Sequence, residues 1–234
     1  MKKARNKEFF FSIVRNIFCI SYFDTNENKL INYHNFELPD NFENELNFEI
    51  LIKFFSEKIK KIEKENSFFI ESANILVDFE SQFLSLSIKN LADKKISEEK
   101  DVMRLIKDAK QLITKLNSSE TILHILINKY LFDKVEYLNF PENLFYSELI
   151  LDLSFITLKN DRIKKAQDIF KNCDVMLNKF ILYDYSKNFI KEDDINNCIA
   201  AKRVNDGANP SEVKILSTIK KDQGFFEKLF NLIG

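Results

Sequence analysis

Residues 9–23 read FFFSIVRNIFCISYF, an apolar stretch that is interrupted only at Arg15 and Asn16. The polar residues 24–28 follow it, and a second apolar stretch covers residues 30–38. Runs rich in Phe, Ile and Val that are separated by a short polar segment are typical of paired β-strands. We therefore predict that the N-terminal region, residues 8–40, is a strand, a turn and a second strand.

Later segments have the period of an amphipathic helix. A helix is predicted over residues 47–64, and its apolar stripe consists of Phe48, Leu51, Ile52, Phe55, Ile59 and Ile62. A second helix is predicted over residues 97–115, where Ser97 would supply a capping hydroxyl. Its expected buried face consists of Val102, Leu105, Ile106, Ala109, Leu112 and Ile113. A third helix is predicted over residues 162–173.

The apolar runs between these helices are expected to be strands. Residues 73–79 and 83–88 are predicted to pair with each other, and further strands are predicted over 121–132, 149–158 and 179–185. These elements predict an α+β fold, in which one mixed β-sheet is covered on one face by the first two helices. The main domain is placed at residues 41–187.

Beyond residue 187 the periodic pattern weakens, and residues 205–210, NDGANP, carry loop signals. We expect a linker over residues 188–223.

The last segment, residues 224–234, has a helical period and is strongly amphipathic. Large apolar side chains at the end of a chain, with lysines nearby, are typical of an interfacial membrane anchor. The predicted membrane-binding residues are Phe225, Phe226, Leu229, Phe230, Leu232, Ile233, Lys220, Lys221 and Lys228. A helix this short is marginal in water, so we expect reversible binding. The alternative is a terminal helix that packs on the rest of the protein.

Glycine is scarce in this chain: the first is Gly207, and the whole sequence has 3. Phosphate-binding loops use glycine because a residue without Cβ lets backbone N–H groups close on the anion. We therefore expect no nucleotide-dependent catalysis and no cofactor. The formal net charge is −1, with acidic and basic residues interspersed, so a nucleic-acid partner is not expected.

Residues that could carry chemistry are few and far apart. His34 and His124 form no metal-binding motif, and His124 lies in an apolar strand that predicts a structural core histidine. Cys19, Cys173 and Cys198 have no CxxC spacing and are expected to be reduced thiols of a cytoplasmic protein. We predict no catalytic site and no metal site.

Several stretches between residues 45 and 185 together resemble one protein family. Residues 96–105, ISEEKDVMRL, resemble the motif eIteeDvxRl, and residues 122–125, ILHI, with 130–133, YLFD, resemble iLHv and Y/F-x-v-D. Pro141 and residues 149–157, LILDLSFIT, resemble nPxGmxGxxLexxxhivT, and residues 173–175, CDV, fall at the position of a CGL or aGl. These motifs belong to the SHS2, or 1C, subdomain of the bacterial cell-division actin homologue FtsA. The pilus protein PilM also carries an SHS2 module and resembles the chain less closely.

The nucleotide-binding motifs of FtsA have no match here. Its opening LDIGTSK, which holds the ATP phosphates and the metal, corresponds to residues 11–17, where Ser12 replaces the acid and Val14 replaces the glycine. The second phosphate loop, expected after Tyr185, is missing, and too few residues remain for the second actin lobe. FtsA contacts FtsZ through that lobe, so the resemblance gives no FtsZ-binding surface.

The resemblance implies a non-catalytic, FtsA-like adaptor of the cell-division machinery. Its SHS2 domain would bind a divisome protein, FtsA or another copy of the same chain. Residues 224–234 are similar to FtsA C-terminal helices and would bind the inner face of the cell membrane, so we expect a cytoplasmic, peripheral membrane protein. Two alternatives stay open: an actin-like protein that binds or hydrolyses ATP, and a soluble interaction domain unrelated to division.

Overall fold

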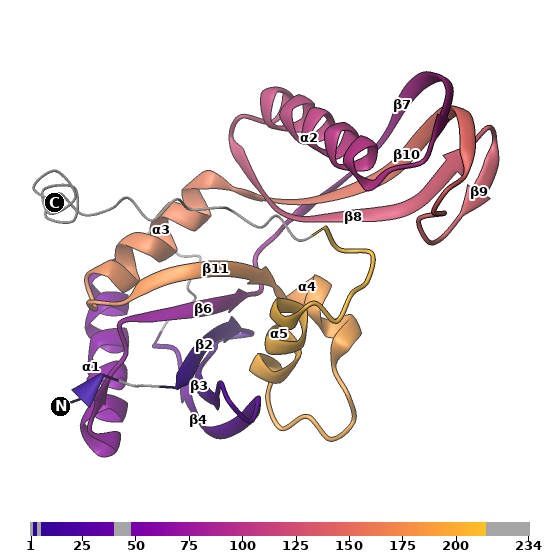
Figure 1. Cartoon of the computed structure of the whole chain (residues 1–234). Helices are drawn as coiled ribbons and strands as arrows, with labels where there is room; N and C mark the ends of the chain where they lie inside the picture. Colours follow the sequence, from indigo (N-terminus) through magenta and orange to yellow (C-terminus); the bar gives the residue numbers. More distant parts are fainter. Residues whose placement is uncertain (1, 4–5, 40–47, 214–234) are drawn as a thin grey trace, which may run out of the picture.

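The computed structural model describes residues 2–3, 6–39 and 48–213, and the fold is α+β, as the sequence predicts (Figure 1). The strands form two main sheets, one of five strands and one of four, rather than the single sheet that we expected. Each sheet has a hydrophobic core of its own.

The five-stranded sheet has the order β11-β6-β2-β3-β4. Its strands are β2 (Lys7–Val14), β3 (Ile17–Asp24), β4 (Lys29–Glu37), β6 (Ser72–Val77) and β11 (Met176–Leu182). Strand β2 is antiparallel to β3 and parallel to β6, which is in turn parallel to β11. A small parallel pair, β1 (Lys2–Lys3) and β5 (Phe68–Phe69), lies apart from it.

The predicted N-terminal hairpin is present, but the run 9–23 is two strands rather than one. Arg15 and Asn16 have φ values of 49° and 66° and connect Val14 to its partner Ile17. A two-residue turn with positive φ at both positions matches the twist of an antiparallel pair. The hairpin is therefore β2–β3, and β4 adds a third antiparallel strand through residues 25–28.

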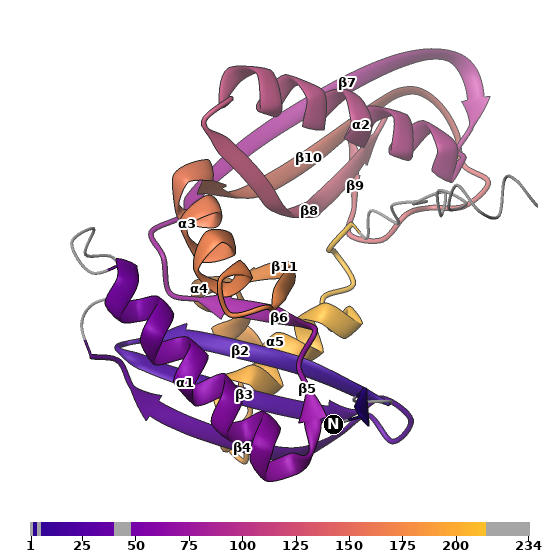
Figure 2. The same ribbon diagram turned by 90° about the vertical axis from the view of Figure 1, so that its left-hand side faces the viewer.

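Helices cover both faces of this sheet. Helix α1 (Phe48–Asn66) and helix α3 (Asn160–Lys171) lie on one face, as Figure 2 shows for α1. There the ring of Phe18 lies 4.7 Å from that of Phe55 and 6.1 Å from that of Phe170. On the other face, the thiol of Cys198 in α5 (Asn197–Asp206) donates a hydrogen bond to the Phe10 carbonyl at 3.7 Å. Because β2 and β3 are buried along nearly their whole length, they need cover on two sides.

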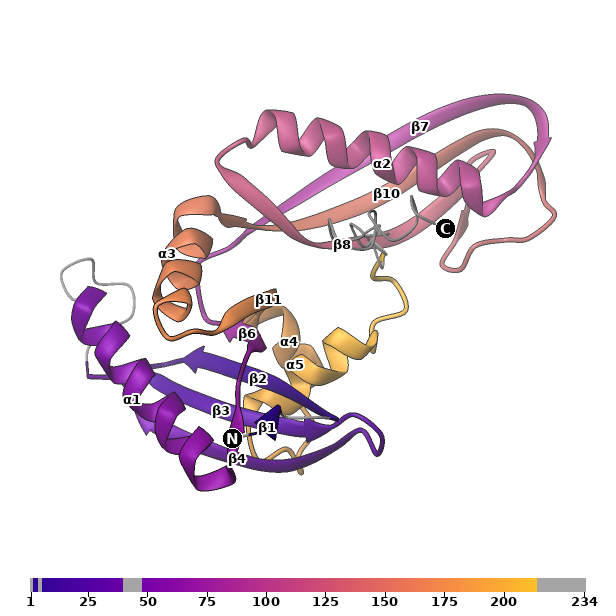
Figure 3. The ribbon, with the colours of Figure 1, turned by 60° about the vertical axis from the view of Figure 1, so that its left-hand side comes forward.

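The four-stranded sheet is antiparallel and has the order β7-β10-β8-β9. Its strands are β7 (Gln82–Ile96), β8 (Glu120–Phe132), β9 (Val135–Tyr137) and β10 (Phe145–Lys159). Helix α2 (Glu99–Leu116) lies along one face (Figure 3). The predicted pairing of residues 73–79 with 83–88 is wrong, because β6 belongs to the first sheet and β7 to the second. Strand β6 is buried on both faces, whereas β7 alternates between half-buried and exposed positions, so the two fit different sheets.

Helix α2 differs from the prediction at two residues. Ser97 does not cap the helix: Glu98 is the N-cap residue, and the Ser97 hydroxyl donates to the Pro141 carbonyl at 2.6 Å. Leu112 is 43% exposed, whereas the other five predicted positions are buried. The apolar stripe of α2 is therefore narrower than the sequence suggested.

The chain after β11 is more ordered than expected. Strand β11 ends at Leu182, and the predicted end of the strand at 185 is instead helix α4 (Tyr183–Ser186), followed by the 3-10 helix η2 (Lys187–Phe189). Helix α5 falls within the expected linker 188–223. It begins after the N-cap Asn196 and ends at Gly207, whose φ of 88° is left-handed. Its apolar residues Cys198 and Val204 belong to the first core, so residues 188–206 are part of the folded body.

Residues 209–213 lie along β8. Leu126 and Glu212 form an antiparallel bridge, and the amide of Ile127 donates to the Ser211 carbonyl at 2.9 Å. The predicted membrane helix at 224–234 lies outside the described residues. Within the described ranges, no helix is both long enough and apolar enough to cross a bilayer.

Candidate functional site

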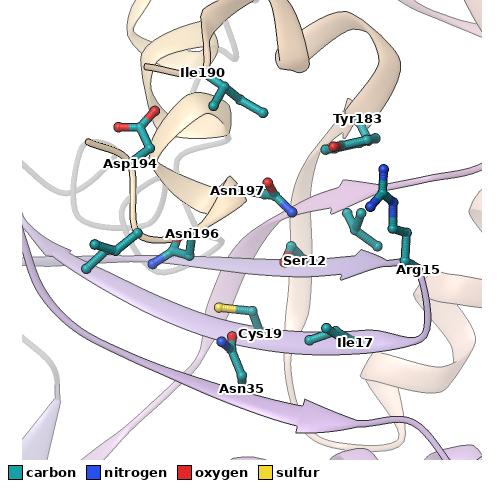
Figure 4. Close-up of a pocket in the computed structure, with 12 residues that line it drawn as sticks. Ser12, Arg15, Ile17, Cys19, Asn35, Tyr183, Ile190, Asp194, Asn196 and Asn197 are labelled. Carbon is teal, nitrogen blue, oxygen red and sulfur yellow. The ribbon is translucent and has the colours of Figure 1, made fainter. Parts of the chain in front are cut away.

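A cavity of about 340 Å³ lies beside the turn between β2 and β3. Strand residues form its floor and the segment after β11 forms its wall (Figure 4). Its lining residues are Ser12, Val14, Arg15, Ile17, Cys19, Asn35, Tyr183, Ile190, Asp194, Ile195, Asn196 and Asn197. Strands β2, β6 and β11 are parallel, so their carboxyl ends meet at this edge, where open α/β sheets bind ligands. We therefore treat this cavity as the candidate functional site.

The floor of the cavity is made of small polar side chains in register. Ser12 on β2 lies opposite Cys19 on β3, and Cys19 lies opposite Asn35 on β4. The Cys19 sulfur lies 3.4 Å from the Ser21 hydroxyl. A hydrogen bond with the buried Cys198 thiol lowers the pKa of Cys19, and burial opposes this shift. Cys19 is a buried free thiol that lines the cavity.

The N-terminal end of α5 forms one wall. The Asn196 side-chain oxygen accepts a hydrogen bond from the Cys198 amide at 2.9 Å, which caps the helix. The same oxygen accepts a longer bond, at 3.4 Å, from the Ser21 hydroxyl on β3. The Asn196 amide nitrogen is buried and has no hydrogen-bond partner among the described residues.

Asp194, also in the wall, is engaged by Arg203 from α5. The Arg203 guanidinium donates to both carboxylate oxygens of Asp194, one of them at 2.6 Å, and to the Phe189 carbonyl at 2.9 Å. Burial alone would raise the pKa of Asp194, but the bonds from Arg203 hold it below its ordinary value. This bidentate pair fixes the wall and leaves Asp194 as a structural carboxylate.

The carboxyl edge of the parallel strands, where Arg15 lines the cavity, carries charges of both signs. Arg15 follows β2, Asp78 follows β6, and Asp184 lies in α4 after β11. Desolvation and the nearby Asp184 carboxylate raise the pKa of Asp78, and Arg15 opposes the shift. Lys187 donates to Asp184 at 2.6 Å. The edge thus carries a mixed, nearly balanced set of charges rather than a strong anion or cation site.

The cavity lining contains several kinds of polar group. Its polar groups are hydroxyl, thiol, amide, guanidinium and the carboxylate of Asp194, and no histidine lies among them. Across the described residues, no group of three or more His, Cys, Asp and Glu side chains could hold a metal ion. The β-branched Val14 and Ile17 flank the turn at which the resembled family has glycine.

The predicted core histidine is confirmed, and it has a partner that sequence reasoning missed. His124 is 1% exposed, and its Nδ1 lies 2.8 Å from a carboxylate oxygen of Glu212. The Tyr185 hydroxyl donates to the other oxygen of Glu212 at 2.8 Å, and its ring lies 4.3 Å from that of His124. Burial raises the pKa of Tyr185. Burial would also raise the pKa of Glu212, but the bonds to His124 and Tyr185 lower it. We call His124, Tyr185 and Glu212 the clasp, because they join β8, α4 and the segment 209–213.

The other residues singled out from the sequence lie away from the cavity or outside the described residues. All nine predicted membrane-binding residues, from Lys220 to Ile233, lie outside the described residues. Cys173 is buried, and burial raises its pKa to about 11, so it is a neutral thiol near neutral pH. The cavity itself escaped sequence analysis because its residues come from two distant segments, 12–35 and 183–197. Asn196 before α5 and Gly207 after it were the available sequence signals for the wall of the cavity.

Most of the stretches that resemble the SHS2 subdomain lie together in the four-stranded unit, whereas residues 173–175 precede β11, and Cys173 and Val175 belong to the first core. Residues 96–105 run from the end of β7 into α2, residues 122–125 and 130–132 lie in β8, and residues 149–157 lie in β10. The face of this sheet away from α2 carries polar pairs: Asn128 donates to Ser154 at 2.9 Å, and Ser87 donates to Asp152. Lys129 donates to Glu136 at 3.0 Å. An antiparallel sheet with one solvated face fits this pattern.

No model of a protein family matches the sequence, and no curated protein matches it. Among solved structures, a chain of a PilM-PilN type IV pilus biogenesis complex is similar with a TM-score of 0.43 and 6% sequence identity. The similarity covers 76% of this chain and 48% of that chain, so the chain spans about half the length of the solved protein. A likeness at this level says nothing about what the chain binds.

Proposed function

We propose that the protein is a non-catalytic adaptor of the bacterial cell-division machinery, with an SHS2-like unit for protein partners and a C-terminal membrane anchor. One observation carries most of the proposal. Four of the stretches that resemble FtsA, at 96–105, 122–125, 130–133 and 149–157, come together in one helix-backed antiparallel sheet with its own core, whereas 173–175 lies with the first sheet. A unit with a separate core and a solvated outer face is suited to docking.

The cavity supports the non-catalytic part of the proposal. At the turn that corresponds to the family's first phosphate loop, Val14 and Ile17 line the cavity, and Arg15 and Asn16 form the tight turn. The wall carboxylate Asp194 is bound by Arg203. These features are poor ones for cradling a triphosphate, which requires close approach of several backbone N–H groups.

The experiment is to image fluorescent fusions of the full chain in the cells from which it comes. We expect a band at midcell. The double substitution Phe226→Asp and Phe230→Asp should make the signal diffuse, because it places two charges on the predicted apolar side. Asn231→Asp adds a charge on the predicted polar side and serves as the matched control, which should keep the band.

A diffuse signal from the unsubstituted chain would remove the division role. Retention of the band by the double variant would instead remove the membrane anchor at 224–234 and leave protein contacts as the means of localisation.

Nucleotide binding is the rival function, and the cavity favours it in one respect. The cavity lies at the carboxyl edge of parallel strands, the usual ligand position in such sheets. Calorimetric titration of the full chain with ATP and magnesium decides between the two. We expect no binding heat, whereas saturable heat that is lost in Ser12→Phe, a variant that fills the cavity floor, would favour the rival.

A further inference from the structure

The outermost strand of the four-stranded sheet has a free edge. Strand β7 is 15 residues long and pairs with β10 on one side only. Within the part of the chain that the structure describes, no strand pairs with its other side. An edge of this length presents a row of backbone N–H and C=O groups that can template the addition of another strand.

The regular part of this edge has a clear midpoint. From Gln82 to Leu91, β7 pairs residue by residue with β10. The register then shifts, and Lys94 has a φ of 38°, so the strand bends after this stretch. The middle of this regular stretch lies between Leu86 and Ser87.

Two large apolar side chains are placed symmetrically about Ser87. Phe83 is 61% exposed and Leu91 is 70% exposed. Each lies four residues from Ser87, so all three point to the same face of the sheet, the face away from α2. On the other face, Leu86 and Ile88 flank Ser87 and pack against the second core.

We propose that the β7 edge binds a second copy of this chain, antiparallel, about a two-fold axis at Ser87. In this register Phe83 faces Leu91 of the partner subunit, and the same contact repeats on the other side of the axis. Leu86 faces Ile88 of the partner subunit on the α2 face. The two sheets join into one, with both α2 helices on the same side.

Two registers displaced toward the C-terminal end of β7 fit less well. An axis at Ile88 would place Phe83 opposite Asp93 and Leu91 opposite Ser85. An axis at Lys89 would place two lysines opposite each other, and like charges in that position are destabilising. With the axis at Ser87, Lys89 faces Ser85 of the partner subunit, and no like charges meet along residues 82–92.

This inference deepens the proposed adaptor function, on which it rests, by naming the partner of the SHS2-like unit as a second copy. One added strand pair is a small interface, so the dimer should be weak in solution. Copies gathered on one membrane would be at a high effective concentration, which strengthens weak contacts without new ones.

The test is disulfide cross-linking of the full chain carrying Ser87→Cys under mild oxidation. The native cysteines are buried, so they should not compete. Ser85→Cys is the matched control, since it is exposed on the same face of the same strand. In the proposed register the two introduced thiols at 85 are four residues out of alignment, about 14 Å apart. We expect a covalent dimer from Ser87→Cys and none from Ser85→Cys. No dimer at 87, or equal dimers at both positions, would overturn the proposal.

A second pair of variants tests the contacts themselves. In the Ser87→Cys background, Phe83→Glu or Leu91→Lys alone should sharply reduce cross-linking, because each places a charge against an apolar group. Together they should restore it, because a glutamate then faces a lysine across the axis. If cross-linking were not restored in the double variant, this register would be refuted.

The dimer and the proposed function can fail separately. A midcell band without cross-linking would remove the dimer alone, and cross-linking with a diffuse cellular signal would remove the division role alone.

Discussion

At the residue scale, buried polar groups define where distant segments meet. The clasp joins His124 of β8 to Tyr185 of α4 through the carboxylate of Glu212, whose side chain is 8% exposed. Sequence analysis placed His124 in the core but could not find Glu212, because 88 positions separate the two and nothing local links them. Asn209 adds a further bond by donating to the Tyr185 hydroxyl at 2.9 Å.

Glu212→Gln should lower the free energy of unfolding at neutral pH by about 1–3 kcal/mol, because it weakens bonds to a buried carboxylate. The folded-state pKa of Glu212 is lowered, so its contribution is present above the unfolded-state pKa and is lost as pH falls through the folded-state pKa. The variant should therefore lose less stability than the unsubstituted protein on acidification. Urea unfolding near neutral pH and at acidic pH measures both effects.

Glu192→Gln, at an exposed position before α5, is the control and should change neither quantity. If the free energy of unfolding changed equally with pH in the Glu212→Gln variant and the unsubstituted protein, the lowered pKa of Glu212 would be contradicted.

At the element scale, periodic segments were predictable and strand partners were not. The predicted apolar stripe of α1 is confirmed at Leu51, Phe55, Ile59 and Ile62, which are all buried. The predicted partner of β6 was wrong, because a short apolar run fits any buried strand. Its actual partners, β2 and β11, are distant from it in the sequence. Helix α5 was missed because its apolar residues are small and few, although Asn196 and Gly207 mark its ends.

Asn196→Ala should destabilise the protein by about 1 kcal/mol, because it removes the cap of α5 and the bond from Ser21. Lys191→Ala, at an exposed position just upstream, should have little effect. Thermal and denaturant unfolding of the two variants measure the difference. Equal stability of both would mean that α5 contributes little to the fold.

At the scale of the whole molecule, the α+β class and the N-terminal hairpin were predictable, and the arrangement of the two sheets was not. Local pattern indicates which residues are buried but not which of two cores they join, and the cavity exists only where residues 12–35 meet residues 183–197. The proposed division of labour follows from this arrangement. The first sheet carries the cavity, the second carries the free β7 edge, and the chain beyond 213 carries the predicted anchor.

The most direct measurement of the central claim is vesicle co-sedimentation of the full chain and of a variant ending at Val213, each with and without ATP and magnesium. Ending at Val213 keeps the clasp, so a folded control is expected, which its thermal unfolding verifies. The full chain should sediment equally with and without nucleotide, and the shortened chain should stay in solution. Sedimentation that depends on ATP, or that persists in the shortened chain, would contradict a nucleotide-independent adaptor held to the membrane by its C-terminal residues.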